Sequence, residues 1–133
     1  MTILKPEWCL TPSGLQTGMA IELADGLVRD VVPAARHPEI PVASGRLALP
    51  GLVNAHSHAF QRAIRGHVQW RPSGRDDFWS WRDRMYRTAN ALDPDGLEAV
   101  SALAFLEMAQ AGISQVGEFH YLHHQPDGTP YAD

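Results

Sequence analysis

Leu49-Pro50-Gly51-Leu52-Val53-Asn54-Ala55-His56-Ser57-His58 is the stretch of this 133-residue chain that decides its fold. Apolar residues lead out of a Pro-Gly turn and into two histidines that one residue separates. Side chains at positions i and i+2 of a β-strand point to the same face, so His56 and His58 can direct two imidazoles at one point. Imidazole is the commonest side-chain metal ligand, and one zinc ion accepts two or three of them. The pattern predicts half of a catalytic metal site at the end of a buried strand.

The residues before this stretch predict short strands joined by turns. Trp8-Cys9-Leu10 is typical of a strand, and a cluster of turn-forming residues follows it. Asp25-Gly26, a strong hairpin signal, separates strands predicted over residues 19–23 and 27–32. Residues 33–45 contain three prolines and few periodic apolar positions, which indicates a connection.

The apolar pattern changes at Leu47. Residues 47–49 and 52–53 are almost continuously apolar, which is typical of a strand buried on both faces. A short helix is expected near Ala59-Phe60. Residues 65–77 contain two glycines, a proline and several charges, and they predict a long surface loop.

Two helices and a second strand follow. Helical spacing places five apolar side chains on one face of the first helix: Phe78, Trp81, Met85, Ala89 and Leu92. The second helix is predicted to begin at Asp93, a good N-cap, with Pro94 in its first position and Gly112 at its C-cap. Residues 113–119 then predict a second buried strand. The order strand, helices, strand defines a βαβ-type unit with a parallel sheet.

The run from Pro50 to His58 resembles the first metal motif of the amidohydrolase superfamily. The resemblance implies an α/β fold, in which this motif ends the first strand of a (β/α)₈ barrel. Residues 1–49 would be the N-terminal strand segment of a small β-sandwich beside the barrel. Residues 50–133 would supply its first two to three β/α units. Because a full barrel has about 250 residues, we expect an incomplete barrel, the N-terminal part of a longer protein.

Three further blocks narrow the resemblance. Residues 58–63, 78–82 and 118–124, together with Asn54-Ala55, resemble the formimidoylglutamate deiminase family. The resemblance implies conversion of N-formimidoyl-L-glutamate and water to N-formyl-L-glutamate and ammonia, in histidine degradation. The alternatives are another deaminase of the superfamily, acting on an aminated ring or a guanidine, a non-catalytic truncated product, and a small binding module with a surface metal.

The resemblance also implies one divalent metal ion, usually zinc, with His56 and His58 as two of its ligands. A third histidine, an aspartate and the general acid/base groups belong to later strands of the family, so no catalytic residue is assigned here. The simpler alternative makes both histidines ordinary core or surface residues, but their position after Pro50-Gly51 favours ligation. Two ligands are fewer than the three that a catalytic zinc usually has, so we expect the 133-residue chain alone to be inactive.

Gln61, Arg82 and Tyr121 match substrate-contacting positions of the family. The substrate carries two carboxylates, and arginine receives a carboxylate through two parallel hydrogen bonds. Without the resemblance, Arg82 would be interpreted as a solvated helix charge or as an ion pair with Asp77 or Asp83. A buried carboxylate at Glu118 could orient a neighbouring residue. Ordinary polar or packing roles are expected for three more histidines: His120, His123 and His124.

The composition is that of an ordinary folded protein, with 44% apolar residues, 20% charged residues and a net charge of −4. No basic patch predicts nucleic acid, and no apolar stretch approaches the ~20 residues of a membrane helix. The single cysteine, Cys9, fits a reducing compartment. We therefore expect a cytoplasmic protein without nucleic-acid or membrane partners, which acts on a small carboxylate-bearing substrate. For the complete protein we expect a homodimer.

Overall fold

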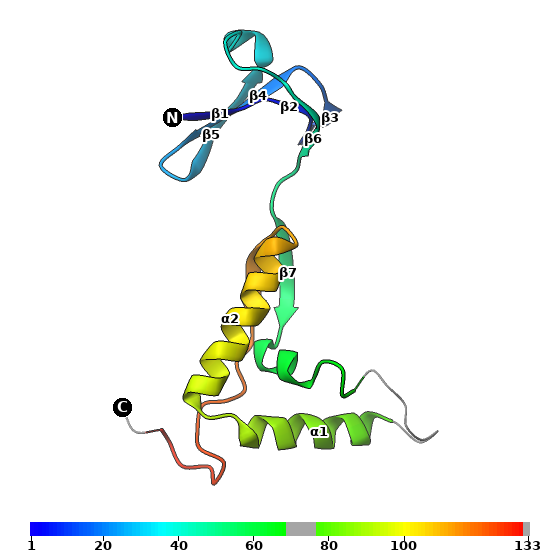
Figure 1. The fold of residues 1–133 in the computed structure, drawn as a ribbon, viewed down its shortest axis with the longest axis vertical. Coiled ribbons are helices and arrows are strands. Elements are labelled where there is room, and N and C mark those ends of the chain that lie inside the picture. The colour runs from blue at the N-terminus through cyan, green and yellow to red at the C-terminus, as the bar shows by residue number, and fades with distance from the viewer. Residues whose placement is uncertain (69–76, 132–133) are drawn as a thin grey trace. The chain divides into compact units, whose positions relative to one another are not determined.

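The computed structural model describes residues 1–68 and 77–131, arranged in two compact units (Figure 1). The first unit is Met1–Pro50 and the second is Gly51–Asp133. Most of the predicted loop over residues 65–77 lies outside the described residues. No helix among the described residues is both long enough and apolar enough to cross a membrane.

The first unit consists of two three-stranded sheets and one short 3₁₀ turn. Its elements are β1 (Thr2–Leu4), β2 (Pro6–Thr11), β3 (Gly14–Gln16), β4 (Met19–Ala24), β5 (Leu27–Pro33), η1 (Ala34–Arg36) and β6 (Ala43–Ala48). One sheet has the order β1-β4-β5 and the other the order β3-β2-β6. The predicted strands at residues 8–10, 19–23 and 27–32 are confirmed.

The hairpin between β4 and β5 turns where the sequence predicts it. Asp25 and Gly26 have φ values of 54° and 74°, and positive φ at both central residues is the signature of a type I′ turn. The predicted connection over residues 33–45 is too long by a few residues, because β6 already begins at Ala43 and pairs parallel with β2. That pairing is a long-range contact, which local composition does not encode.

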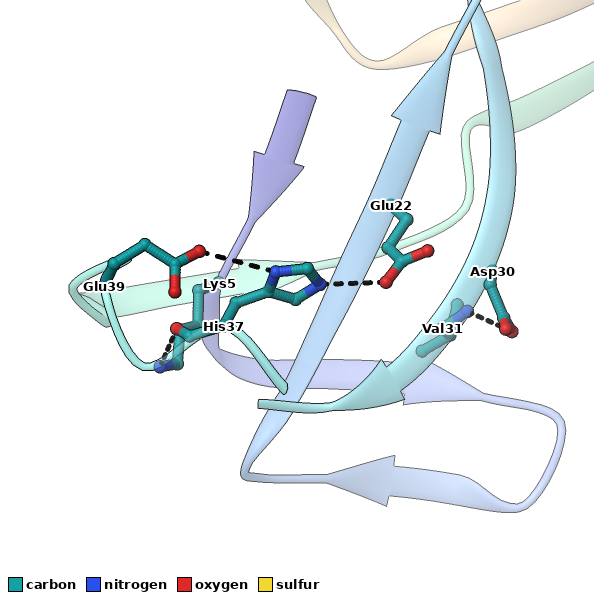
Figure 2. A network of polar contacts seen from close by, with 6 residues as sticks. All are labelled: Lys5, Glu22, Asp30, Val31, His37 and Glu39. Carbon is teal, nitrogen blue, oxygen red and sulfur yellow. Dashed lines mark hydrogen bonds and ion pairs between the residues drawn. The ribbon is translucent and has the colours of Figure 1, made fainter. Parts of the chain in front are cut away.

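A polar network fixes the chain after η1 against β4 (Figure 2). His37 Nε2 lies 2.8 Å from Glu22 Oε1, and His37 Nδ1 lies 3.5 Å from Glu39 Oε1. Lys5 Nζ donates to the His37 carbonyl oxygen at 3.0 Å. The His37 side chain is only 13% exposed, so these contacts satisfy a ring that is almost removed from water.

The second unit is built on a parallel pair of strands. Its elements are β7 (Leu52–Ser57), η2 (Ala59–Ile64), α1 (Phe78–Ala91), α2 (Pro94–Gln110) and β8 (Ile113–Glu118). Asp93 caps α2 by accepting a hydrogen bond from Gly96 N at 2.7 Å, and Gly112 ends the helix at a φ of 82°. The predicted order strand, helices, strand with parallel pairing is confirmed.

The core of the second unit lies where η2 meets α1. Four buried residues form it, and they are Phe60, Ile64, Met85 and Ala89. Trp81 and Leu92 pack against this cluster, as their helical spacing predicts, whereas Phe78 is 61% exposed. The predicted apolar face of α1 is therefore correct except at its first residue.

The prediction that the apolar run at residues 47–53 is a strand buried on both faces is wrong. The run is divided between β6 and β7, which belong to different sheets. Leu52 and Val53 are 56% and 63% exposed. An apolar strand is buried on both faces only when other elements cover both. In the part of the chain that the structure describes, β7 has one neighbouring strand, β8.

Candidate metal centre

The last residues of β7 form a β-bulge against β8. The register passes from Asn54 opposite Val116 to Ser57 opposite Glu118, so β7 contains one residue more than β8 over this stretch. A β-bulge bends its strand and changes the direction of side chains. Gly117 lies opposite the bulge, where an added Cβ would be 2.9 Å from the Ala55 carbonyl oxygen.

The two predicted metal ligands meet at this bulge. His56 Nε2 and His58 Nε2 are 2.9 Å apart, and the rings are almost perpendicular, at 83°. Asn54 Oδ1 accepts a hydrogen bond from His56 N at 3.2 Å and so supports the bulged backbone. His56 is exposed and His58 is half-buried, so both nitrogens are within reach of a solute.

The second histidine is held in the tautomer that a metal ligand needs. His58 Nδ1 is 3.0 Å from the Phe119 carbonyl oxygen. Because a carbonyl oxygen only accepts, Nδ1 carries the proton and Nε2 of the neutral ring keeps its lone pair. A ligating histidine commonly donates its other N–H to such a carbonyl.

The pair fits a metal ion but does not complete its coordination. Two nitrogens at ~2.0–2.1 Å from one zinc ion are at most about 4 Å apart, and the observed separation of 2.9 Å lies within that limit. No group of three or more His, Cys, Asp or Glu residues among residues 1–68 and 77–131 could hold a metal. His56 and His58 are therefore suited to be part of a ligand set.

An ion pair anchors the helix that follows the second histidine. Arg62 Nε and Nη2 on η2 donate to the two carboxylate oxygens of Glu107 on α2, at 2.6 and 2.7 Å. Arg65 Nη1 lies 3.5 Å from the same carboxylate. The hydrogen bond from Arg62 holds the pKa of Glu107 below its ordinary value of 4.5. The pair joins residues 45 positions apart, so no local pattern in the sequence revealed it.

The ion pair between Arg62 and Glu107 is expected to affect how the stability of the fold changes with pH. Because the pKa of Glu107 is lower in the folded protein than in the unfolded chain, the pair stabilises the fold above pH 4.5. That contribution disappears as the pH falls through the folded-state pKa. We expect Glu107→Gln to be less stable than the wild type at pH 7 and to lose less stability on acidification. Urea denaturation at pH 7, 4 and 3 measures this, and equal acid sensitivity in both proteins would contradict it.

Of the three predicted substrate residues, the structure brings Tyr121 to the histidines. Its ring centroid is 4.7 Å from that of His58. Tyr121 also contacts Phe60 and Phe119, with centroids 5.7 and 5.1 Å away. The phenol ring is thus part of an aromatic cluster beside the predicted ligand.

The other two predicted substrate residues have contacts on α1. Gln61 Nε2 is 3.5 Å from Met85 Sδ. The guanidinium of Arg82 lies between two rings of its own helix, 4.9 Å from the centroid of Tyr86 and 5.7 Å from that of Trp79. Both distances are within cation–π range.

Asp77 and Asp83 could have paired with Arg82, but each makes other contacts among the described residues. Asp77 caps α1 by accepting from Trp79 N and Ser80 N. Asp83 pairs with Arg87 at 2.7 Å. The ion-pair interpretation of Arg82 is therefore wrong, and its side chain is an exposed cation on α1.

His120 and His123 make local polar contacts. His123 Nε2 lies 2.8 Å from the His120 carbonyl oxygen, and His120 Nδ1 lies 3.9 Å from Glu118 Oε1. Glu118 accepts a hydrogen bond from Ala59 N at 2.7 Å. Sequence reasoning singled out Glu118 but missed Gly117 and the Phe119 carbonyl, since backbone contacts and close approaches leave no residue-type signal.

The amidohydrolase family profile matches residues 47–132, and the chain belongs to that family. Over its whole length it is 39% identical to formimidoylglutamate deiminase of Pseudomonas aeruginosa, of which it covers 29%. This identity confirms the resemblance that the sequence blocks indicate.

Other relatives share parts of the same region. The chain is 29% identical to 8-oxoguanine deaminase of Pseudomonas aeruginosa, over 90% of its own length and 27% of that protein. A crystal structure of an amidohydrolase from Brucella melitensis superposes with a TM-score of 0.83 at 35% identity, over 99% of this chain and 29% of that one. An adenosine deaminase from Xanthomonas campestris with bound Zn superposes at 0.71 and 20% identity, over 91% and 29%, and supports the fold alone. The chain thus spans less than a third of the length of these relatives.

Proposed function

We propose that this chain belongs to a metal-dependent deiminase that converts N-formimidoyl-L-glutamate and water to N-formyl-L-glutamate and ammonia, a step of histidine degradation. One observation carries the proposal: His56 Nε2 and His58 Nε2 converge to 2.9 Å, with His58 Nδ1 held by a backbone carbonyl. The 39% identity to a formimidoylglutamate deiminase supports the choice of substrate.

The architecture that goes with this function is a (β/α)₈ barrel. Parallel β7 and β8 with the helices between them are consistent with its first strand-helix units. We propose that residues 1–49, which contain all six strands of the two small sheets, belong to an accessory β-sandwich. The histidines end β7, and the ends of parallel strands are where barrel enzymes place their catalytic residues.

His56 and His58 would hold one divalent ion, most simply zinc, with a third histidine and an aspartate from later strands. When bound, such an ion activates water at neutral pH. The water oxygen adds to the formimidoyl carbon and the bond from that carbon to the terminal nitrogen then breaks, while the bond to the glutamate nitrogen is kept. The terminal nitrogen gains a proton and leaves as ammonia, and the added oxygen loses its proton to become the formyl oxygen. The Phe119 carbonyl keeps the proton of His58 on Nδ1 throughout, which preserves the Nε2 lone pair for ligation.

Recognition of the glutamate portion would fall to Gln61, Arg82 and Tyr121. Arg82 presents its guanidinium between the rings of Trp79 and Tyr86, an arrangement that restricts its rotation and leaves its donors free for a carboxylate. Tyr121 lies against His58 and would offer its hydroxyl close to the reacting carbon. A neutral ring substrate has no use for a free guanidinium, which favours a carboxylate-bearing substrate.

The complete open reading frame that contains these residues, called the complete protein below, tests the proposal. We expect it to release ammonia from N-formimidoyl-L-glutamate with a kcat/KM at least about 100-fold above that for 8-oxoguanine or adenosine, because a neutral ring cannot pair with the polar groups that would bind the two carboxylates. A higher kcat/KM for either ring compound would contradict the proposed substrate. It would favour the alternative, a deaminase that acts on an aminated ring. Residues 1–133 expressed alone are expected to release none, because the ligand set is incomplete.

We propose further that the complete protein is a cytoplasmic homodimer, without nucleic-acid or membrane partners. Cys9 is free and buried, and a single free cysteine suits a reducing compartment. Light scattering of the purified complete protein measures the oligomeric state directly, and a monomeric mass would overturn this part of the proposal.

A further inference from the structure

We propose that Glu118 is a positioning residue for the metal ligand His58, acting through the backbone N–H of Ala59. This inference rests on the proposed function, because it presumes a cation at His56 and His58. It assigns a task to a carboxylate that stands outside the expected ligand set and does not touch the substrate.

Three hydrogen bonds from the end of β8 surround His58. Phe119 N donates to Ser57 O at 2.9 Å, and the Phe119 carbonyl accepts from His58 Nδ1 at 3.0 Å. Glu118 Oε1 accepts from Ala59 N at 2.7 Å. The residue before His58, its ring and the residue after it are therefore all attached to the same two residues of the neighbouring strand. Of the three groups that Glu118 and Phe119 contribute, only the Glu118 carboxylate belongs to a side chain, so only this group depends on residue type.

The bond at Ala59 satisfies an N–H group at the start of η2. Ala59 is the first residue of η2, and the first N–H groups of a helix have no partner within it. The N-cap residue usually satisfies one of them with its own side chain. Here the N-cap residue is His58, whose side chain makes no capping bond. Glu118 supplies an acceptor for Ala59 N from β8, and the imidazole of His58 takes no part in capping η2.

The burial of Glu118 shows that this arrangement is specific. Its side chain is 10% exposed. Within the part of the chain that the structure describes, Oε2 is buried and has no hydrogen-bond partner. A buried carboxylate oxygen without a partner is unfavourable for folding. Stability alone therefore does not account for a carboxylate at this position, whereas the position of His58 does.

The test compares zinc affinity in four forms of the complete protein: wild type, Glu118→Leu, Glu118→Gln and, as a matched control, Glu98→Ala. Leucine fills the same space without an acceptor, glutamine keeps one oxygen for Ala59 N, and Glu98 is an exposed carboxylate on α2. We expect Glu118→Leu to weaken zinc binding about 10–100-fold, as loss of an outer partner of a ligand does. Glu118→Gln and Glu98→Ala are expected to stay within about threefold of the wild type.

Thermal unfolding of the metal-free proteins separates positioning from folding. A Glu118→Leu protein that unfolds at a lower temperature but binds zinc like the wild type would overturn the inference. Should Glu118→Leu not fold, Glu118→Asp takes its place, because the shorter side chain keeps the charge and withdraws the acceptor from Ala59 N. Unchanged affinity in that variant would overturn the inference as well. A wild type that binds no zinc would instead overturn the proposed function.

Discussion

Replacing both His56 and His58 with alanine is expected to remove the metal and the activity of the complete protein. The two Nε2 atoms are 2.9 Å apart, so each substitution withdraws one ligand from the same point. Loss of an outer partner of a ligand already costs about 10–100-fold in affinity or activity, and loss of two ligands must cost more. We expect zinc content to fall from one ion per chain to none and kcat/KM to fall at least about 100-fold, measured by metal analysis and ammonia release.

The matched control for this experiment is His124→Ala. His124 is exposed and lies beyond β8, so its variant should retain zinc and activity. Chelation of the wild type should reproduce the loss, and added zinc should restore activity in the wild type but not in the double variant. Full activity and full zinc content without either histidine would remove the basis of the proposed function.

Local signals in the sequence predicted several elements in each of the two units. Asp25-Gly26 set the hairpin turn because two consecutive residues there need positive φ, which this pair tolerates. Asp93 and Gly112 set the ends of α2 because helix ends need a side-chain acceptor and a left-handed residue. The spacing of His56 and His58 predicted that their rings converge, and the 2.9 Å separation bears this out.

Features that depend on partners far away in the chain could not be predicted from the local sequence. The pairing of β6 with β2 and the Arg62–Glu107 ion pair join residues far apart in the chain. The apolar run at residues 47–53 predicted burial, but burial requires other elements on both faces. The composition of a segment indicates which of its side chains can be buried. It does not indicate which other elements of the fold will cover them.

The histidine site itself combines both kinds of signal. The two candidate ligands could be picked out by residue type, since few residue types bind metal through nitrogen. The groups that orient His58 are the Phe119 carbonyl and the Glu118 side chain, and only the second was visible as a residue type. Every residue has a backbone carbonyl, so the sequence does not indicate which carbonyl will accept from His58. That partner is identified only once β7 and β8 are paired in the structure.

A second large effect is expected when Gly117 is replaced by a residue with a side chain. A Cβ there would lie 2.9 Å from the Ala55 carbonyl oxygen and 3.3 Å from its carbon. Both atoms belong to the backbone, so no side chain can turn away to relieve the contact. Gly117→Val should therefore push the bulge of β7 away from β8, and overpacking of this kind destabilises by roughly 1–3 kcal/mol.

Displacement of the bulge should also reach the metal site, because His56 is part of it and His58 follows directly. A misplacement of about 1 Å at a catalytic group can cost 10²-fold in rate, so we expect about a 100-fold loss of kcat/KM together with weaker zinc binding. Gln115→Ala, an exposed change on the same strand, is the control and should leave both unchanged. If Gly117→Val lowered the unfolding temperature but left zinc affinity intact, the bulge would be a feature of strand pairing alone. The histidines would then owe their convergence to their spacing and to the bonds from Phe119 and Glu118.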